Sequence, residues 1–144
     1  MGYSLALPIV LINTEWYMVL AGWLIMHYVC GMILALIFQP AHVIENTTFP
    51  LPDANGNMQD DWATHQLKTT LDFAQKSRFF SWFVGGLNFQ VEHHLFPNIC
   101  HIHYKNLAPL IKQTAEEFNL PYHTKKTFGG AIAGHAKLLY ALGR

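Results

Sequence analysis

The first forty residues of the chain form an almost unbroken apolar stretch. Residues 16–38 carry no formal charge and would rise about 35 Å as a helix, enough to cross the hydrocarbon core of a bilayer. Residues 2–12 are also apolar but make up only about half of a span, so we expect them to be the last part of a spanning helix that begins upstream. The short polar connection at residues 13–15 predicts an antiparallel membrane hairpin over residues 1–38, its first span truncated.

The remaining residues, 39–144, mix polar loops with shorter apolar segments. Gln39 and Pro40 are expected to end the second span, and residues 49–60 are rich in turn-forming residues. Residues 79–89 are strongly apolar but too short to span, which favours an interfacial or buried segment. Helical spacing of apolar residues predicts a helix over residues 61–75, started by Asp60 and Asp61, and two more after Pro97. These positions are Trp62, Leu67, Leu71 and Ala74, then Tyr104, Leu107, Ile111 and Phe118, and finally Ile132, Ala136 and Tyr140. The predicted fold class is all-α, an integral membrane helical hairpin followed by a cytoplasmic helical cap.

Charge is distributed unevenly along the chain. All nine Lys and Arg residues follow residue 60, so the tendency of positive charge to stay inside places residues 39–144 in the cytoplasm. The net charge is zero and no basic run is present, which excludes nucleic acid as a partner. The two cysteines, Cys30 and Cys100, lie in very different surroundings and do not indicate a disulfide framework.

The candidate chemistry lies in residues 90–94, QVEHH. Gln90, His93 and His94 occupy positions i, i+3 and i+4 of a helix, which project from one face toward neighbouring metal ions. Neutral imidazole binds first-row metals well, and two adjacent histidines can each serve one ion of a close pair. The alternative is that the histidine pair is an interfacial or buried structural feature.

A denser set of ligand types also allows a zinc site. His93, His94, Cys100, His101 and His103 are close in sequence, and these residue types bind zinc. The spacing lacks the second ordered pair of ligands that zinc modules usually repeat, which disfavours this alternative.

The string GGLNFQVEHHLFP, residues 85–97, resembles the third histidine box of membrane fatty-acid desaturases. Gln90 stands where the front-end subgroup has glutamine and most desaturases have histidine. The segments FQPAHVIENTTFP and DWATHQLKTT upstream, and ICHIHYKNLAPLIKQTAEEFNLPY downstream, are similar to the same subgroup, so the resemblance covers nearly the whole chain.

The resemblance implies an oxidoreductase that uses O2 to introduce a double bond into a monounsaturated or polyunsaturated acyl chain. Two non-heme iron ions would be the cofactor, and no catalytic residue is expected apart from the metal ligands. The substrate would be a fatty-acyl lipid or an acyl-CoA, and electrons would come from an external b-type cytochrome or ferredoxin. The first two histidine boxes, of HxxxH and HxxHH type, would lie upstream of Met1.

The expected site residues fall into three groups. The metal ligands are His93, His94 and Gln90, with His42 added because the family has an iron-binding histidine just beyond the second span; a helix-terminal role is the alternative for His42. Supporting roles near the ligands are expected for Glu92, which orients an imidazole or stays solvated, and for Asn88, Gln39 and His65. Candidate walls for a dry acyl channel are Phe80, Trp82, Phe83 and Phe89, with core packing as the alternative.

A different class of function is compatible with this assignment. Two or three ligands cannot close a di-iron site, so the isolated chain is expected to be a non-catalytic membrane segment that lacks turnover and binds iron weakly.

Overall fold

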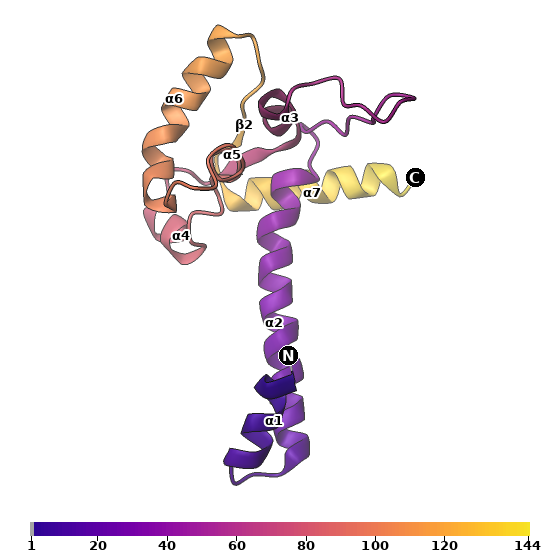
Figure 1. Cartoon of the computed structure of the whole chain (residues 1–144), viewed down its shortest axis with the longest axis vertical. Coiled ribbons are helices and arrows are strands. Elements are labelled where there is room, and N and C mark those ends of the chain that lie inside the picture. The colour runs from indigo at the N-terminus through magenta and orange to yellow at the C-terminus, as the bar shows by residue number, and fades with distance from the viewer. Residues whose placement is uncertain (1) are drawn as a thin grey trace. The chain divides into compact units, whose positions relative to one another are not determined.

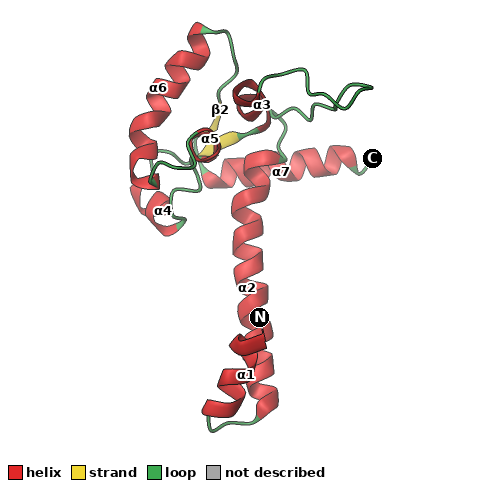
Figure 2. Ribbon diagram, in the orientation of Figure 1, coloured by secondary structure: helices red, strands yellow, loops and turns green. Residues whose placement is uncertain are grey.

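The computed structural model describes residues 2–144, which separate into two compact units, residues 2–36 and 37–144. Figure 1 labels α1–α7 and β2 and follows the chain by colour, and Figure 2 shows that helices dominate, with one short pair of strands. The elements are α1 (Gly2–Leu11), α2 (Trp16–His42), α3 (Trp62–Thr69), β1 (Leu71–Phe73), α4 (Arg78–Phe83), α5 (Gln90–Leu95), η1 (His101–His103), α6 (Tyr104–Glu117), β2 (His123–Lys125) and α7 (Phe128–Leu142).

The first unit contains α1 and most of α2. Within residues 2–144, α2 is the one helix that is long and apolar enough to cross a membrane. Its apolar side chains are largely exposed, as at Ile25 (63%), an arrangement that lipid rather than water would favour. The Trp23 indole N–H donates to Ser4 Oγ at 3.2 Å, so α1 lies against the first part of α2.

The helix α2 extends two residues beyond Pro40, where the sequence predicts the end of the second span. The helix continues to His42, and Val43 N–H donates to Gln39 O at 2.8 Å. Pro40, Ala41 and Ile44 are buried in the second unit, and this packing holds the last turn despite the missing proline N–H.

A parallel pair of strands replaces the end of the helix predicted for residues 61–75. The helix α3 begins as expected, with Asp61 as N-cap accepting from Thr64 N–H at 3.1 Å, but it ends at Thr69. Residues 70–73 are all buried, and Asp72 pairs with Thr124 of β2. The partner strand lies about fifty residues away in sequence, so helical periodicity near residue 71 could not indicate it.

The two C-terminal helices form where the sequence predicts them, but their buried faces differ from the expected ones. Tyr104 and Ile111 of α6 are buried as expected, whereas Phe118 follows the helix and is 70% exposed. The buried residues of α7 are Ala131 and Gly134 rather than Ile132, Ala136 and Tyr140. Small residues are needed here because a Cβ at Gly134 would lie 2.8 Å from Ile44 Cδ1.

The short helix α5 lies at the centre of the second unit. It contacts α3, α6 and β1, and in Figure 1 it lies between α6 and α3. An isolated helix of six residues is unstable in water, so these tertiary contacts hold the QVEHH segment in place.

Candidate metal centre

Two histidines of α5, His93 and His94, lie close to a third, His42, from a distant segment of the chain. The His94 ring centroid lies 5.0 Å from that of His42, the last residue of α2, and 5.8 Å from that of His93. Within residues 2–144, however, no three His, Cys, Asp or Glu side chains converge closely enough to hold one ion. The described residues therefore bring together part of a ligand set.

His94 is held by a residue that the sequence interpretation missed. Its Nδ1 lies 2.6 Å from Gln66 Oε1 of α3, and because a carbonyl oxygen only accepts, Nδ1 carries the proton. The lone pair is then on Nε2, the nitrogen left for a metal. Burial, with His42 and His93 nearby, lowers the pKa of His94 to about 4, so its imidazole is neutral at physiological pH.

His93 has a comparable partner in Tyr104, the first residue of α6. Its Nδ1 lies 3.3 Å from the Tyr104 hydroxyl, and Tyr104 is buried. Burial raises the pKa of Tyr104, so the phenol keeps its proton. Both histidines of the pair thus have a partner at Nδ1, and for His94 that partner leaves the lone pair on Nε2.

Buried polar atoms without partners test whether these residues fit a metal. Gln90 is fully buried, and in the described part of the chain neither its Oε1 nor its Nε2 has a hydrogen-bond partner. His65 Nδ1 is also buried without one, and His65 and His42 line the same cavity of about 310 Å³. Polar atoms left in this state are costly unless something satisfies them. Imidazole nitrogens and a side-chain amide on the same short helix are donors that fit a bound first-row metal with its water.

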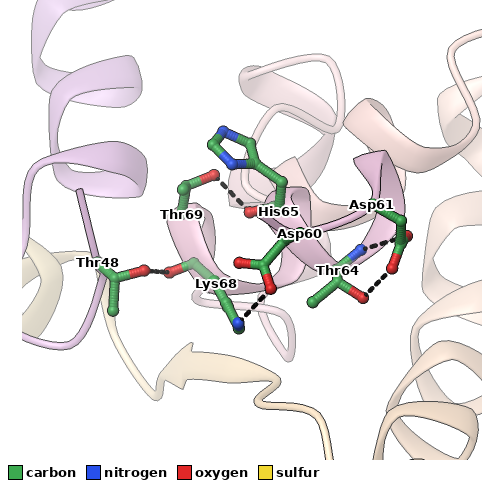
Figure 3. A network of polar contacts seen from close by, with 7 residues as sticks. All are labelled: Thr48, Asp60, Asp61, Thr64, His65, Lys68 and Thr69. Carbon is green, nitrogen blue, oxygen red and sulfur yellow. Dashed lines mark hydrogen bonds and ion pairs between the residues drawn. The ribbon is translucent and has the colours of Figure 1, made fainter. Parts of the chain in front are cut away.

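The helix α3, which carries His65 and Gln66, is fixed by surrounding polar contacts (Figure 3). Thr48 Oγ1 donates to Lys68 O at 3.3 Å, and Lys68 Nζ pairs with Asp60 at 2.6 Å. The His65 imidazole takes part in none of these contacts, although its carbonyl accepts from Thr69 Oγ1 at 2.9 Å. The network thus positions Gln66 for His94 without using the His65 ring.

Glu92 faces away from solvent, so of its two expected roles, orienting an imidazole or staying solvated, the second is wrong. Both Glu92 and Asp72 are fully buried, and the Tyr122 hydroxyl lies 2.8 Å from one carboxylate oxygen of each. Burial and the neighbouring Glu92 raise the pKa of Asp72 well above its usual range. Asp72 Oδ1 also accepts from Val91 N–H at 2.9 Å, so this buried cluster anchors the start of α5.

Asn88 and Gln39 lie in other surroundings than expected. The Asn88 amide donates to Phe73 O at 3.1 Å and to Ser81 Oγ at 3.0 Å, so it joins α4 to β1 rather than reaching the histidines. Gln39 is exposed on α2, one turn before His42.

The four aromatic residues expected to line an acyl channel do not form one wall. Phe80 packs against Phe73 and Phe128 in the core, as the core-packing alternative expects, and Phe83 is 61% exposed. Trp82 and Phe89 share a cavity, but Arg78 and Lys105 line it too.

The residues of the zinc alternative remain dispersed. Cys100, His101 and His103 are exposed, and Cys100 Sγ lies 4.0 Å from His101 Nδ1. No group of three His, Cys, Asp or Glu side chains of the described chain includes them.

Comparison with known proteins places these features in a family. The family model for fatty acid desaturases matches residues 2–126. The chain is 43% identical to the sn-1 linoleoyl-lipid 6-desaturase of Synechocystis sp. over all of this chain and 40% of that protein. It is 46% identical to the enzyme of the same name from Arthrospira platensis, over 79% of this chain and 31% of that one. It is 43% identical to the acyl-lipid (8-3)-desaturase of Mortierella alpina, over 88% and 29% respectively. No solved structure matches.

Proposed function

Because the chain belongs to the fatty acid desaturase family, we propose that it forms the C-terminal catalytic part of a front-end fatty-acid desaturase. Such an enzyme introduces a double bond between an existing one and the carboxyl end of an acyl chain. The observation that carries the proposal is the gathering of His42, His93 and His94, with His94 fixed by Gln66 so that Nε2 is left for a metal. The printed names of the relatives support an acyl-lipid substrate.

The proposed iron ligands are His93, His94 and His42, with Gln90 contributing its buried amide directly or through water. An unactivated methylene C–H bond does not yield to acid–base groups, so iron would supply the O2 chemistry that this reaction requires. Gln66 holds the neutral imidazole of His94 in one tautomer and orientation. Burial around α5 excludes bulk water from the amide of Gln90.

The site is completed, in this proposal, by residues outside the chain. The chain spans 40% of the length of its Synechocystis relative, and the described residues gather no three-ligand group. We therefore expect the remaining ligands to come from upstream histidine boxes. The isolated chain is expected to bind iron weakly and to lack turnover.

The membrane arrangement is part of the same proposal. Residues 1–38 would lie in the bilayer and residues 39–144 in the cytoplasm, where a b-type cytochrome or ferredoxin could deliver electrons. The long apolar helix α2, and the restriction of Lys and Arg to positions after residue 60, support this orientation.

A chimera tests the proposal. The upstream part of the Synechocystis relative is joined to this chain in place of its own C-terminal part, and fatty-acid products and iron content are measured in membranes. We expect a new double bond on the carboxyl side of an existing one, and loss of both product and iron in His93→Ala and His94→Ala. The exposed His103 provides the control, and His103→Ala should retain both. Products made only from saturated chains, or full activity in His94→Ala, would refute the proposal.

A further inference from the structure

A cleft lined by positive charge lies on the side of the second unit where α4, η1 and α6 come together. It consists of two adjoining cavities of about 380 and 360 Å³, which share Gln75, Phe89 and Lys105 in their walls. Of the residues that the structure describes, no Asp or Glu lines either cavity. The cationic residues that line this basic cleft are Lys76, Arg78, Lys105 and Lys112.

These cations are poorly neutralised by the rest of the fold. In the described part of the chain, Lys76, Arg78 and Lys105 form no ion pair, and Lys112 has one loose, exposed pair with Glu116 at 3.8 Å. Four of the nine Lys and Arg residues thus surround one hollow in a chain of zero net charge. A concave surface lined by one sign of charge concentrates the field and attracts ions of the opposite sign.

Exposed aromatic side chains adjoin the basic cleft. Phe79, Trp82 and Phe83 of α4 are 74%, 75% and 61% exposed, and Trp82 lines the cleft together with Ile102, which is 67% exposed. The rings form one cluster, with centroids of Phe79 and Trp82 6.1 Å apart. Aromatic residues beside cations are typical of surfaces that lie at the headgroup level of a bilayer.

We propose that the basic cleft binds the phosphate of an anionic phospholipid headgroup, while Phe79, Trp82 and Ile102 contact the start of its acyl chains. Lys76, Arg78 and Lys105 supply donors for a phosphate, and the planar guanidinium of Arg78 can donate to two phosphate oxygens at once. An acidic protein would match the charge but would leave the exposed aromatic rings unexplained. This site is separate from the histidines and does not depend on the proposed desaturase activity.

Lipid titration of the purified full chain in detergent tests this site. The probe is a short-chain phosphatidylglycerol, with short-chain phosphatidylcholine and inorganic phosphate for comparison, and bound lipid is counted by native mass spectrometry. The cleft variant combines Lys76→Gln, Arg78→Gln and Lys105→Gln. The control combines Lys126→Gln and Lys137→Gln with Arg144→Gln, which removes equal charge elsewhere.

The expected result is at least a tenfold weaker affinity for phosphatidylglycerol in the cleft variant and less than a twofold change in the control. Trp82→Ser should weaken binding of the lipid but not of inorganic phosphate. Equal losses in both triple variants would mean non-specific charge attraction and would overturn the proposal. So would unchanged lipid binding in the cleft variant together with loss of binding to an acidic b-type cytochrome, since the occupant would then be a protein.

Discussion

The buried cluster beneath the histidine box makes Tyr122→Phe the most informative single change. The Tyr122 hydroxyl lies 2.8 Å from both Asp72 Oδ2 and Glu92 Oε1, and it accepts from Gln75 Nε2 at 3.0 Å. A hydroxyl has one proton, so it donates to one carboxyl while a protonated Asp72 supplies the other hydrogen bond. The raised pKa of Asp72 fits this arrangement. Phenylalanine keeps the ring but removes the oxygen that joins the two acids.

The magnitude follows from burial. Both carboxyls are fully buried, so each loses a hydrogen-bond partner at an interior position. A hydrogen bond to a charged group contributes about 1.5–3 kcal/mol, and a buried group left without a partner costs about 1–3 kcal/mol. These terms overlap, so we expect Tyr122→Phe to lower the free energy of unfolding by about 3 kcal/mol. For a chain of this size that corresponds to a Tm lower by roughly 6–12 °C.

The assay is thermal unfolding of the purified chain in detergent, followed by circular dichroism. Tyr140→Phe is the matched control, because Tyr140 is 64% exposed. Among the described residues, its one polar partner is Arg144. It should change the free energy of unfolding by less than about 0.5 kcal/mol. A double-mutant cycle with Glu92→Gln adds specificity, since coupled residues should show an interaction of roughly 1 kcal/mol or more.

Two results would refute the reasoning. If Tyr122→Phe unfolds within about 0.5 kcal/mol of the wild type, the hydroxyl does not join the two carboxyls in solution. If its effect simply adds to that of Glu92→Gln, the two residues are not coupled, and the anchoring of α5 must come from other contacts.

Three further predictions concern charge, metal and backbone. Folding raises the pKa of Asp72, so the stability due to its bound proton is present below about pH 4 and is lost as pH rises through the folded pKa. The Tm of Asp72→Asn relative to wild type should therefore increase as pH rises above about 4, and a constant difference would contradict this. Gln66→Ala removes the acceptor that fixes His94, so in the chimera iron affinity should fall about 10–100-fold, with rescue by Gln66→Glu, and unchanged iron content would argue against the role. Gly86 has φ +78° and lies against a neighbouring side chain, so Gly86→Ala should lower the free energy of unfolding by about 1–3 kcal/mol. Gly129 lies on the open face of α7, so Gly129→Ala should raise the free energy of unfolding by about 0.5–1 kcal/mol. Equal effects of the two changes in thermal unfolding would refute the strain argument.

The sequence by itself determined the features that depend on neighbours along the chain. A long uncharged apolar run specifies α2, and Asp61 caps α3 through a contact three residues away. The spacing of Gln90, His93 and His94 corresponds to one short helix, which the structure contains as α5. The string around them also carries the family, because its residues form a continuous motif.

Only the tertiary structure decided which distant groups meet. Gln66 reaches His94 across 28 residues, and Tyr122 reaches Asp72 across 50. The β1–β2 pair, likewise, forms because two separate segments meet in one core, although residues near 71 follow a helical spacing. Hydrophobic periodicity reports how one segment faces its surroundings, whereas partners of buried polar groups depend on which segments pack together. For that reason the sequence was enough to predict the histidines as candidate ligands, but not to predict the residues that orient them.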